Sequence, residues 1–216
     1  MQTVGLLGGT FDPVHNGHVQ LAEAVLSRTA LDKILFIPAA APPHKTDSSL
    51  CAIGHRLEMV RRAIGSLPRC EVSEREASSG GPSYTIDTLL SLRADNGGIT
   101  NYVFILGGDA FLEIETWHRW PKLLASTDFI VVVRRGVSPR ELRTLLNHHG
   151  YRTRSETVEG HYRGRSGTSV WVLDVPIDDI SSTDIRRRIA ENEPWRHLVP
   201  ARVADYIDEH RLYRQP

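Results

Sequence analysis

The sequence predicts an α/β fold in which a doubly wound, mostly parallel sheet carries a small helical segment at its C-terminal end. Short runs of β-branched and apolar residues alternate with helical patterns along the chain. Strand, helix and strand in this order are typical of a parallel sheet that is covered on both faces. The 216 residues suffice for one such unit, so we expect a single domain over 1–216, with about 181–216 as its C-terminal helical part.

The elements follow in order from local patterns. The strands are short runs of β-formers, and the clearest of them ends in Gly107-Gly108-Asp109. The predicted strands are 3–7, 33–37, 71–73, 102–106, 129–133 and 170–175. The helices are apolar at helical spacing and are bounded by proline, glycine or hydroxyl residues. The predicted helices are 18–29, 56–66, 83–95, 117–125, 139–149, 183–191 and 200–210.

Two further segments carry no regular pattern. The stretch 39–50 is proline-rich, and we expect an irregular loop there. The polar stretch 150–167 is rich in arginine and glycine, and we expect a mobile loop. Trp120, Trp171 and Trp195 are interpreted as packing residues.

Composition excludes several classes of protein. Lysine plus arginine equals aspartate plus glutamate, whereas a general nucleic-acid binder usually carries a basic excess. The first residues do not have the pattern of a signal peptide, and no segment approaches the roughly 20 apolar residues of a membrane span. Cys51 and Cys70 lie outside any metal-binding spacing. We therefore expect a cytoplasmic protein with free thiols, bound to neither nucleic acid nor membrane.

The loop after the first predicted strand suits a phosphate ligand. Glycines let a backbone approach a phosphate closely, and the N-terminus of the following helix favours anions. His15 and His18, with Gly17 between them, would place two imidazoles over one small patch. In isolation the same pattern also fits a tight turn whose histidines cap the helix, and a metal site is less favoured.

A second candidate phosphate element opens the helix predicted at 183–191. Hydroxyl side chains and free backbone N–H groups gather at that N-terminus. Arg186 follows Ser182 by four residues and so lies on the same helix face. Taken alone, the pattern also fits a good N-cap followed by a solvated basic helix, and Arg187 and Arg188 are interpreted as surface charges.

The middle of the chain offers features for a second substrate. Lys45 ends a stiff Pro42-Pro43 loop, and Tyr84 and Thr85 begin a helix whose N–H groups are free for an anion. Trp117 follows the Gly107-Gly108-Asp109 turn and could stack on a flat heterocycle. Each feature alone is equally typical of ordinary structure.

Together the motifs resemble a known superfamily. The string GGTFDPVHNGH from Gly8 to His18 is similar to the nucleotide-binding signature of the nucleotidylyltransferases, and ISSTDIR from Ile180 to Arg186 is similar to their second signature. Nearly the whole chain resembles bacterial nicotinate mononucleotide adenylyltransferases, through PPHK, HRLEM, PSYT, GGD with Trp117, VVVRR and YIDEHRLYR. The resemblance implies a Rossmann-like fold.

The resemblance also implies roles for individual residues. His15, His18, Lys45 and Arg186 are the expected catalytic residues. ATP would be bound by both signatures and one aspartate: Gly8, Gly9, Thr10, Phe11, His15, His18, Asp109, Ile180, Ser181, Ser182, Thr183 and Arg186. The acceptor, nicotinate mononucleotide, would be bound by Lys45, Tyr84, Thr85, Trp117 and Arg134. Within these sets, Lys45 would meet the acceptor phosphate, Thr85 the nicotinate carboxylate, Trp117 the pyridine ring and Asp109 ribose hydroxyls.

The implied reaction is a direct transfer. The acceptor phosphate attacks the α-phosphorus of ATP in line and pyrophosphate leaves, so positioning and charge neutralisation suffice. Mg²⁺ is expected to be carried mainly by the ATP phosphates, with no protein ligands. A homo-oligomer is left open.

Four alternatives are less well supported. Pantetheine-phosphate adenylyltransferases and glycerol-phosphate cytidylyltransferases share part of the first signature or a related second one. A class I aminoacyl-tRNA synthetase fragment shares the spacing of the two histidines but needs a K-M-S-K-S loop. A non-catalytic nucleotide sensor would share the fold.

Overall fold

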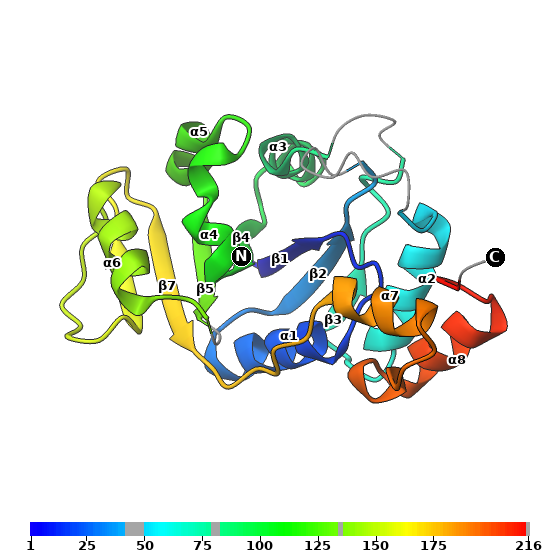
Figure 1. Ribbon diagram of the computed structural model, residues 1–216. Helices are drawn as coiled ribbons and strands as arrows, with labels where there is room; N and C mark the ends of the chain where they lie inside the picture. Colours follow the sequence, from blue (N-terminus) through cyan, green and yellow to red (C-terminus); the bar gives the residue numbers. More distant parts are fainter. Residues whose placement is uncertain (42–49, 79–82, 134–135, 215–216) are drawn as a thin grey trace.

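The computed structural model describes residues 1–41, 50–78, 83–133 and 136–214. Its centre is a seven-stranded sheet in the order β3-β2-β1-β4-β5-β7-β6 (Figure 1). Neighbouring strands are parallel, except that β6 is antiparallel to β7. The strands are β1 (Thr3–Gly9), β2 (Lys33–Pro38), β3 (Cys70–Val72), β4 (Asn101–Gly107), β5 (Asp128–Val133), β6 (Gly160–Arg163) and β7 (Ser169–Asp174).

Helices cover both faces of the sheet, which confirms the predicted doubly wound, Rossmann-like α/β fold (Figure 1). One face carries α1 (Asn16–Arg28), α2 (Ile53–Ile64), α7 (Ser182–Ala190) and α8 (Ala201–Glu209). The other carries α3 (Thr85–Asp95), α4 (Gly108–Leu112), α5 (Trp120–Ser126) and α6 (Pro139–His148). Two 3₁₀ turns, η1 (Ile114–Thr116) and η2 (Arg196–Leu198), complete the elements. In the described ranges, no helix is both long and apolar enough to cross a membrane.

The alternation of side chains along β4 divides the core in two. Tyr102, Phe104 and Leu106 belong to the core on the α3–α6 face, whereas Val103 and Ile105 belong to the core on the α1 face. This period of two is what a strand buried on both sides produces. The interpretation of Trp120, Trp171 and Trp195 as packing residues is confirmed, because each lies partly buried against one of these cores.

The expectation of a loop over 150–167 is wrong at residues 160–163. The segment contains β6, which pairs with β7, and Arg152 bridges to Arg163. Tyr162 is fully buried, and this apolar ring among polar neighbours anchors the strand. Arg143 on α6 donates to the backbone carbonyls of Ser155, Glu156 and Thr157 and so holds the connection in place.

The helix predicted at 117–125 begins later than expected. Arg119 has a φ of 54°, and this left-handed residue caps a helix that starts at Trp120 with Pro121 in its first turn. The sequence also failed to predict α4, which follows β4 directly. Trp117 and His118 therefore lie in a short connection between η1 and α5, rather than on a helix.

Candidate active site

A cavity of about 330 Å³ lies at the carboxyl ends of the central strands. Its walls include residues from β1 and β4 and from the segments that follow β1, β2 and β4. The strand order reverses direction between β1 and β4, because the chain moves from β1 outward to β2 and β3 and then returns. Ligands bind at such a switch point in open α/β sheets, because the loops diverge there and leave a crevice.

The first predicted phosphate loop lies at this cavity. Gly8, Gly9, Thr10, His15 and His18 all line it. The two imidazole rings are tilted by 32° with centroids 3.7 Å apart, and Nδ1 of His18 accepts a hydrogen bond of 3.3 Å from the backbone N–H of His15. The sequence therefore brings both histidines to one patch, as their spacing predicts.

Gly17 makes the close approach of the two histidines feasible. A Cβ at this position would lie 3.2 Å from the backbone oxygen of Asp178 and 3.2 Å from the His15 ring. Such contacts are tighter than ordinary packing, so a side chain would push the ring or the backbone aside. The glycine lets the start of α1 pack against the segment that leads into α7.

The Phe11 side chain does not line the cavity. It is 2% exposed and belongs to the core, with its ring edge toward His18 at a centroid distance of 4.9 Å. A Cβ on Gly9 would lie only 3.0 Å from this ring. The Phe11 ring therefore supports the loop by packing against Gly9 and His18.

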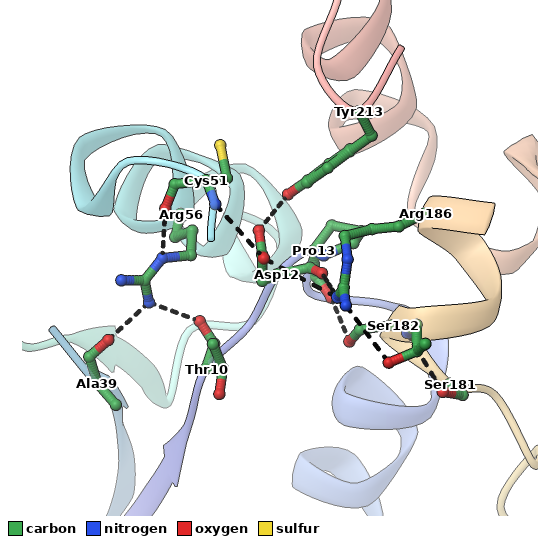
Figure 2. A network of polar contacts seen from close by, with 11 residues as sticks. Thr10, Asp12, Pro13, Ala39, Cys51, Arg56, Ser181, Ser182, Arg186 and Tyr213 are labelled. Carbon is green, nitrogen blue, oxygen red and sulfur yellow. Dashed lines mark hydrogen bonds and ion pairs between the residues drawn. The ribbon is translucent and has the colours of Figure 1, made fainter. Parts of the chain in front are cut away.

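The second predicted phosphate element docks onto the first. The Ser182 hydroxyl donates to the carbonyl of Pro13 at 2.9 Å, and Nη1 of Arg186 donates to the carbonyl of Asp12 at 2.7 Å (Figure 2). Ser181 caps α7 by accepting from the N–H of Thr183. Ile180 is buried in the core, and neither it nor the 181–186 residues predicted for ATP line the cavity. Arg186 thus stands beside the loop, held by a backbone carbonyl.

Asp12, which the sequence did not single out, is the centre of a buried network. Its carboxylate is 1% exposed and accepts a 2.7 Å hydrogen bond from the hydroxyl of Tyr213 near the C-terminal end of the chain (Figure 2). The backbone N–H of Cys51 donates to the other oxygen at 3.5 Å, and Nη1 of Arg186 lies 3.9 Å from that oxygen. Burial, and then the charge of Asp12, raise the pKa of Tyr213, so the hydroxyl stays a donor.

Arg56, in the HRLEM motif, is a second buried anchor, and the sequence did not predict it as a site residue. Its guanidinium donates to the carbonyls of Thr10, Ala39 and Cys51 at 2.8, 2.7 and 2.9 Å (Figure 2). It also donates to the carbonyl of Ala40 at 3.2 Å. Burial lowers the pKa of this guanidinium. Through Thr10 and Ala39, the Arg56 side chain joins the loop after β1 to the loop after β2.

A sequence signal for Arg56 did exist. Arg56 shares the buried face of α2 with Met59, Val60 and Ala63, at helical spacing. A cation on an apolar helix face needs partners, because a buried charge without hydrogen bonds is costly.

The cavity lining also contains the predicted acceptor residues Tyr84, Thr85 and Trp117. The Tyr84 ring stacks on His118 with centroids 4.2 Å apart and an angle of 29° between the planes. Thr85 is the first residue of α3, so its N–H and those that follow lie at a helix N-terminus. Asp109 lines the cavity from the first turn of α4.

Three other cavity residues were missed by the sequence analysis. Glu76 is 8% exposed and accepts from the Thr88 hydroxyl at 2.7 Å. The Ser83 hydroxyl accepts from the N–H groups of Ala40 and Ala41, which joins the β2 loop to the start of α3. His118 is the stacking partner of Tyr84. Serine, glutamate and histidine are too common in loops for spacing to single them out.

Two predicted residues lie outside the described part of the chain. These are Lys45 and Arg134. Their roles stay predictions.

Comparison with known proteins identifies the family of this chain. A family model described as cytidylyltransferase-like matches residues 6–188. A probable nicotinate-nucleotide adenylyltransferase of Symbiobacterium thermophilum is 40% identical over 99% of this chain and 96% of its own length. A protein of the same description from Pseudomonas putida strain GB-1 is 40% identical over 100% of this chain and 97% of its own length. The chain belongs to the cytidylyltransferase-like family and, within it, to the nicotinate-nucleotide adenylyltransferases.

Solved structures show the same fold for this nicotinate-nucleotide adenylyltransferase family member. The Plasmodium falciparum nicotinic acid mononucleotide adenylyltransferase complexed with NaAD has a TM-score of 0.76 and 18% sequence identity. The match covers 99% of this chain and 98% of that one. The conserved arrangement of strands and helices therefore persists at low sequence identity.

Proposed function

We propose that this chain transfers the adenylyl group of ATP to nicotinate mononucleotide, giving deamido-NAD and pyrophosphate in NAD biosynthesis. The observation that carries the proposal is that one cavity is lined both by the His15 and His18 loop and by Tyr84, Thr85 and Trp117. The names of relatives that are 40% identical over nearly the full chain support the same reaction.

The donor end supplies charge and hydrogen-bond donors. His15 and His18 face the ATP phosphates and donate to the oxygens on which negative charge grows as pyrophosphate departs. Arg186 leaves the Asp12 carbonyl and pairs with the β- and γ-phosphates. The acceptor phosphate attacks the α-phosphorus in line, so no protein nucleophile takes part. The rate acceleration comes from holding the acceptor phosphate close to the α-phosphorus of ATP.

The acceptor end supplies shape and one anion site. The free N–H groups at the start of α3, together with the Thr85 hydroxyl, suit the nicotinate carboxylate, because a helix N-terminus favours anions. Trp117 stacks on the pyridine ring, and Asp109 accepts from ribose hydroxyls. Lys45 and Arg134 are proposed to meet the acceptor phosphate and the bound nucleotides, as the resemblance implies.

Mg²⁺ enters this proposal as a partner of the ATP phosphates. The carboxylates of Glu76 and Asp109 are at the cavity, but Glu76 is held by Thr88. Since Mg²⁺ keeps several waters and binds substrate phosphates readily, a site built mainly from phosphates fits these residues. When bound, the ion would neutralise phosphate charge.

The test is pyrophosphate release from ATP and Mg²⁺, with nicotinate mononucleotide and nicotinamide mononucleotide supplied separately. We expect release with the acid and a strong preference over the amide. Thr85→Val should reduce that preference, whereas Thr116→Val, on the exposed η1 turn, should leave it unchanged. No release with either nucleotide would overturn the proposal, and equal use of both would remove the carboxylate contact from it.

A further inference from the structure

Three potential metal ligands meet at the end of α6, outside the cavity. Glu115 lies on η1, His148 is the last residue of α6, and His149 caps that helix. One ligand atom from each residue lies within 4.8 Å of the other two. Glu115 precedes His148 by 33 residues and His149 by 34, so the fold brings the carboxylate to the two histidines.

The His149 side chain is aimed into this cluster. It is 9% exposed, and its ring packs against Trp120 with centroids 4.9 Å apart. Its Nε2 atom is buried and makes no hydrogen bond within the described residues. A carboxylate oxygen of Glu115 lies 3.1 Å from this nitrogen, which is an ion-pair distance when the ring is protonated. A buried ring nitrogen that makes no hydrogen bond is costly, and a cation shared with the carboxylate would relieve that cost.

We propose that Glu115, His148 and His149 bind a zinc-class divalent transition metal. Zinc takes histidine nitrogens and carboxylate oxygens at about 2.0–2.2 Å, so two ligands on one tetrahedral ion lie about 3.3 Å apart. The observed 3.1 Å between Nε2 of His149 and Oε1 of Glu115 fits this spacing. His148 is exposed and completes the set by a side-chain rotation.

The donor set favours this class of metal over others. Two imidazoles and one carboxylate suit zinc and its transition-metal neighbours, whereas magnesium and calcium prefer oxygen ligands alone. Three protein ligands leave a fourth position for water or a further ligand, as in open zinc sites.

The position of the site gives it a consequence for the cavity. Glu115 precedes Trp117 by two residues, and His149 packs on Trp120, which begins α5. A bound ion therefore cross-links α6 to the segment that carries Trp117. This consequence for acceptor binding rests on the proposed function, whereas metal binding itself does not.

The experiment is a metal titration of the full chain after chelator treatment, without nucleotides. Zn²⁺ is competed against a chromophoric chelator, and Co²⁺ is added separately because its absorption reports tetrahedral coordination. We expect one equivalent to bind and the melting temperature to rise with Zn²⁺. Glu115→Gln and His148→Ala, both at exposed positions, should each weaken binding by at least about tenfold.

Matched controls keep the result interpretable. Glu113→Gln removes the same charge two positions away, and His161→Ala removes an exposed imidazole on β6. Both should bind Zn²⁺ as the unchanged chain does. Absence of saturable binding, or equal weakening by cluster and control variants, would overturn the proposal. Pyrophosphate release, assayed separately, distinguishes this failure from failure of the proposed function.

Discussion

At the proposed ATP end of the cavity, buried side chains hold the loop backbone, whereas at the proposed acceptor end aromatic rings line the wall. Arg56 and Ser182 donate to carbonyls of the loop after β1, and Asp12 receives the hydroxyl of Tyr213. At the other end, Tyr84 stacks on His118, and Trp117 also lines the cavity. A triphosphate needs donors at fixed points, whereas a flat ring needs a surface. This difference predicts that variants at the ATP end lower kcat or the stability of the fold, whereas variants at the acceptor end raise the KM for the acceptor.

The largest effect is expected for His18→Ala. Removal of a donor that stabilises charge in the transition state should lower kcat by about 10²–10³-fold, or about 2.7–4 kcal/mol. Steady-state pyrophosphate release measures it. The exposed His161→Ala variant serves as control and should retain full kcat. A loss of less than tenfold in His18→Ala would show that this imidazole does not act on the phosphates.

Arg56→Met should be the most destabilising change at the donor end. The variant leaves several backbone carbonyls buried without a donor, and we expect the free energy of unfolding to fall by about 3 kcal/mol. Urea denaturation measures this loss. Arg61→Met, on the same helix but in an exposed pair with Glu74, should cost less than about 1 kcal/mol.

If Arg56→Met does not fold, Arg56→Lys answers the same question. Lysine keeps the charge but cannot reach all the carbonyls with a planar fork. Stability equal to that of the unchanged chain would contradict the anchoring role.

Tyr213→Phe tests whether the C-terminal end of the chain positions the first loop. A hydrogen bond to a charged group contributes about 1.5–3 kcal/mol, and we expect a loss of stability in that range with a fall in kcat greater than the change in KM. Tyr206→Phe is the control, because its hydroxyl pairs with His55 on α2 rather than with the loop. An unchanged kcat in Tyr213→Phe would limit the residue to a structural role.

The same contact makes stability depend on pH. Burial raises the pKa of Tyr213, so the folded chain keeps a proton that the unfolded chain releases above about pH 10. The contribution of this group is therefore complete below that pH and declines as pH rises further. Between about pH 10 and 11 the stability of Tyr213→Phe should fall less steeply than that of the unchanged chain. Parallel slopes would contradict this linkage.

The smallest effect is expected at the acceptor end. Trp117→Ala should raise KM for nicotinate mononucleotide by about 2- to 10-fold, because an aromatic pair contributes about 0.5–1.5 kcal/mol. The KM for ATP should stay unchanged. Trp195→Ala, a packing residue on the α1 face, should lower stability without raising either KM, and a rise in both constants for Trp117→Ala would argue against a stacking role.

The comparison also shows why prediction from sequence succeeded at some positions. His15 and His18 are three residues apart at the start of a helix, and local geometry alone sets their rings side by side. Tyr84 and Thr85 likewise lie at the start of α3, a helix that the local sequence pattern predicts. By contrast, Asp12 and Tyr213 are 201 positions apart, and no local pattern links them.

The sequence by itself determined the α/β fold, the glycine-rich loop and the two helix N-termini, because each depends on short-range periodicity, turn chemistry and capping. Only the tertiary structure decided how these parts are held. It buried Arg56 against four carbonyls, placed Tyr213 on Asp12 and formed the edge strand β6 around Tyr162 within the polar 150–167 segment. It also gathered Glu115, His148 and His149. These arrangements depend on which distant surfaces meet across the sheet, and that is fixed by packing rather than by any local pattern.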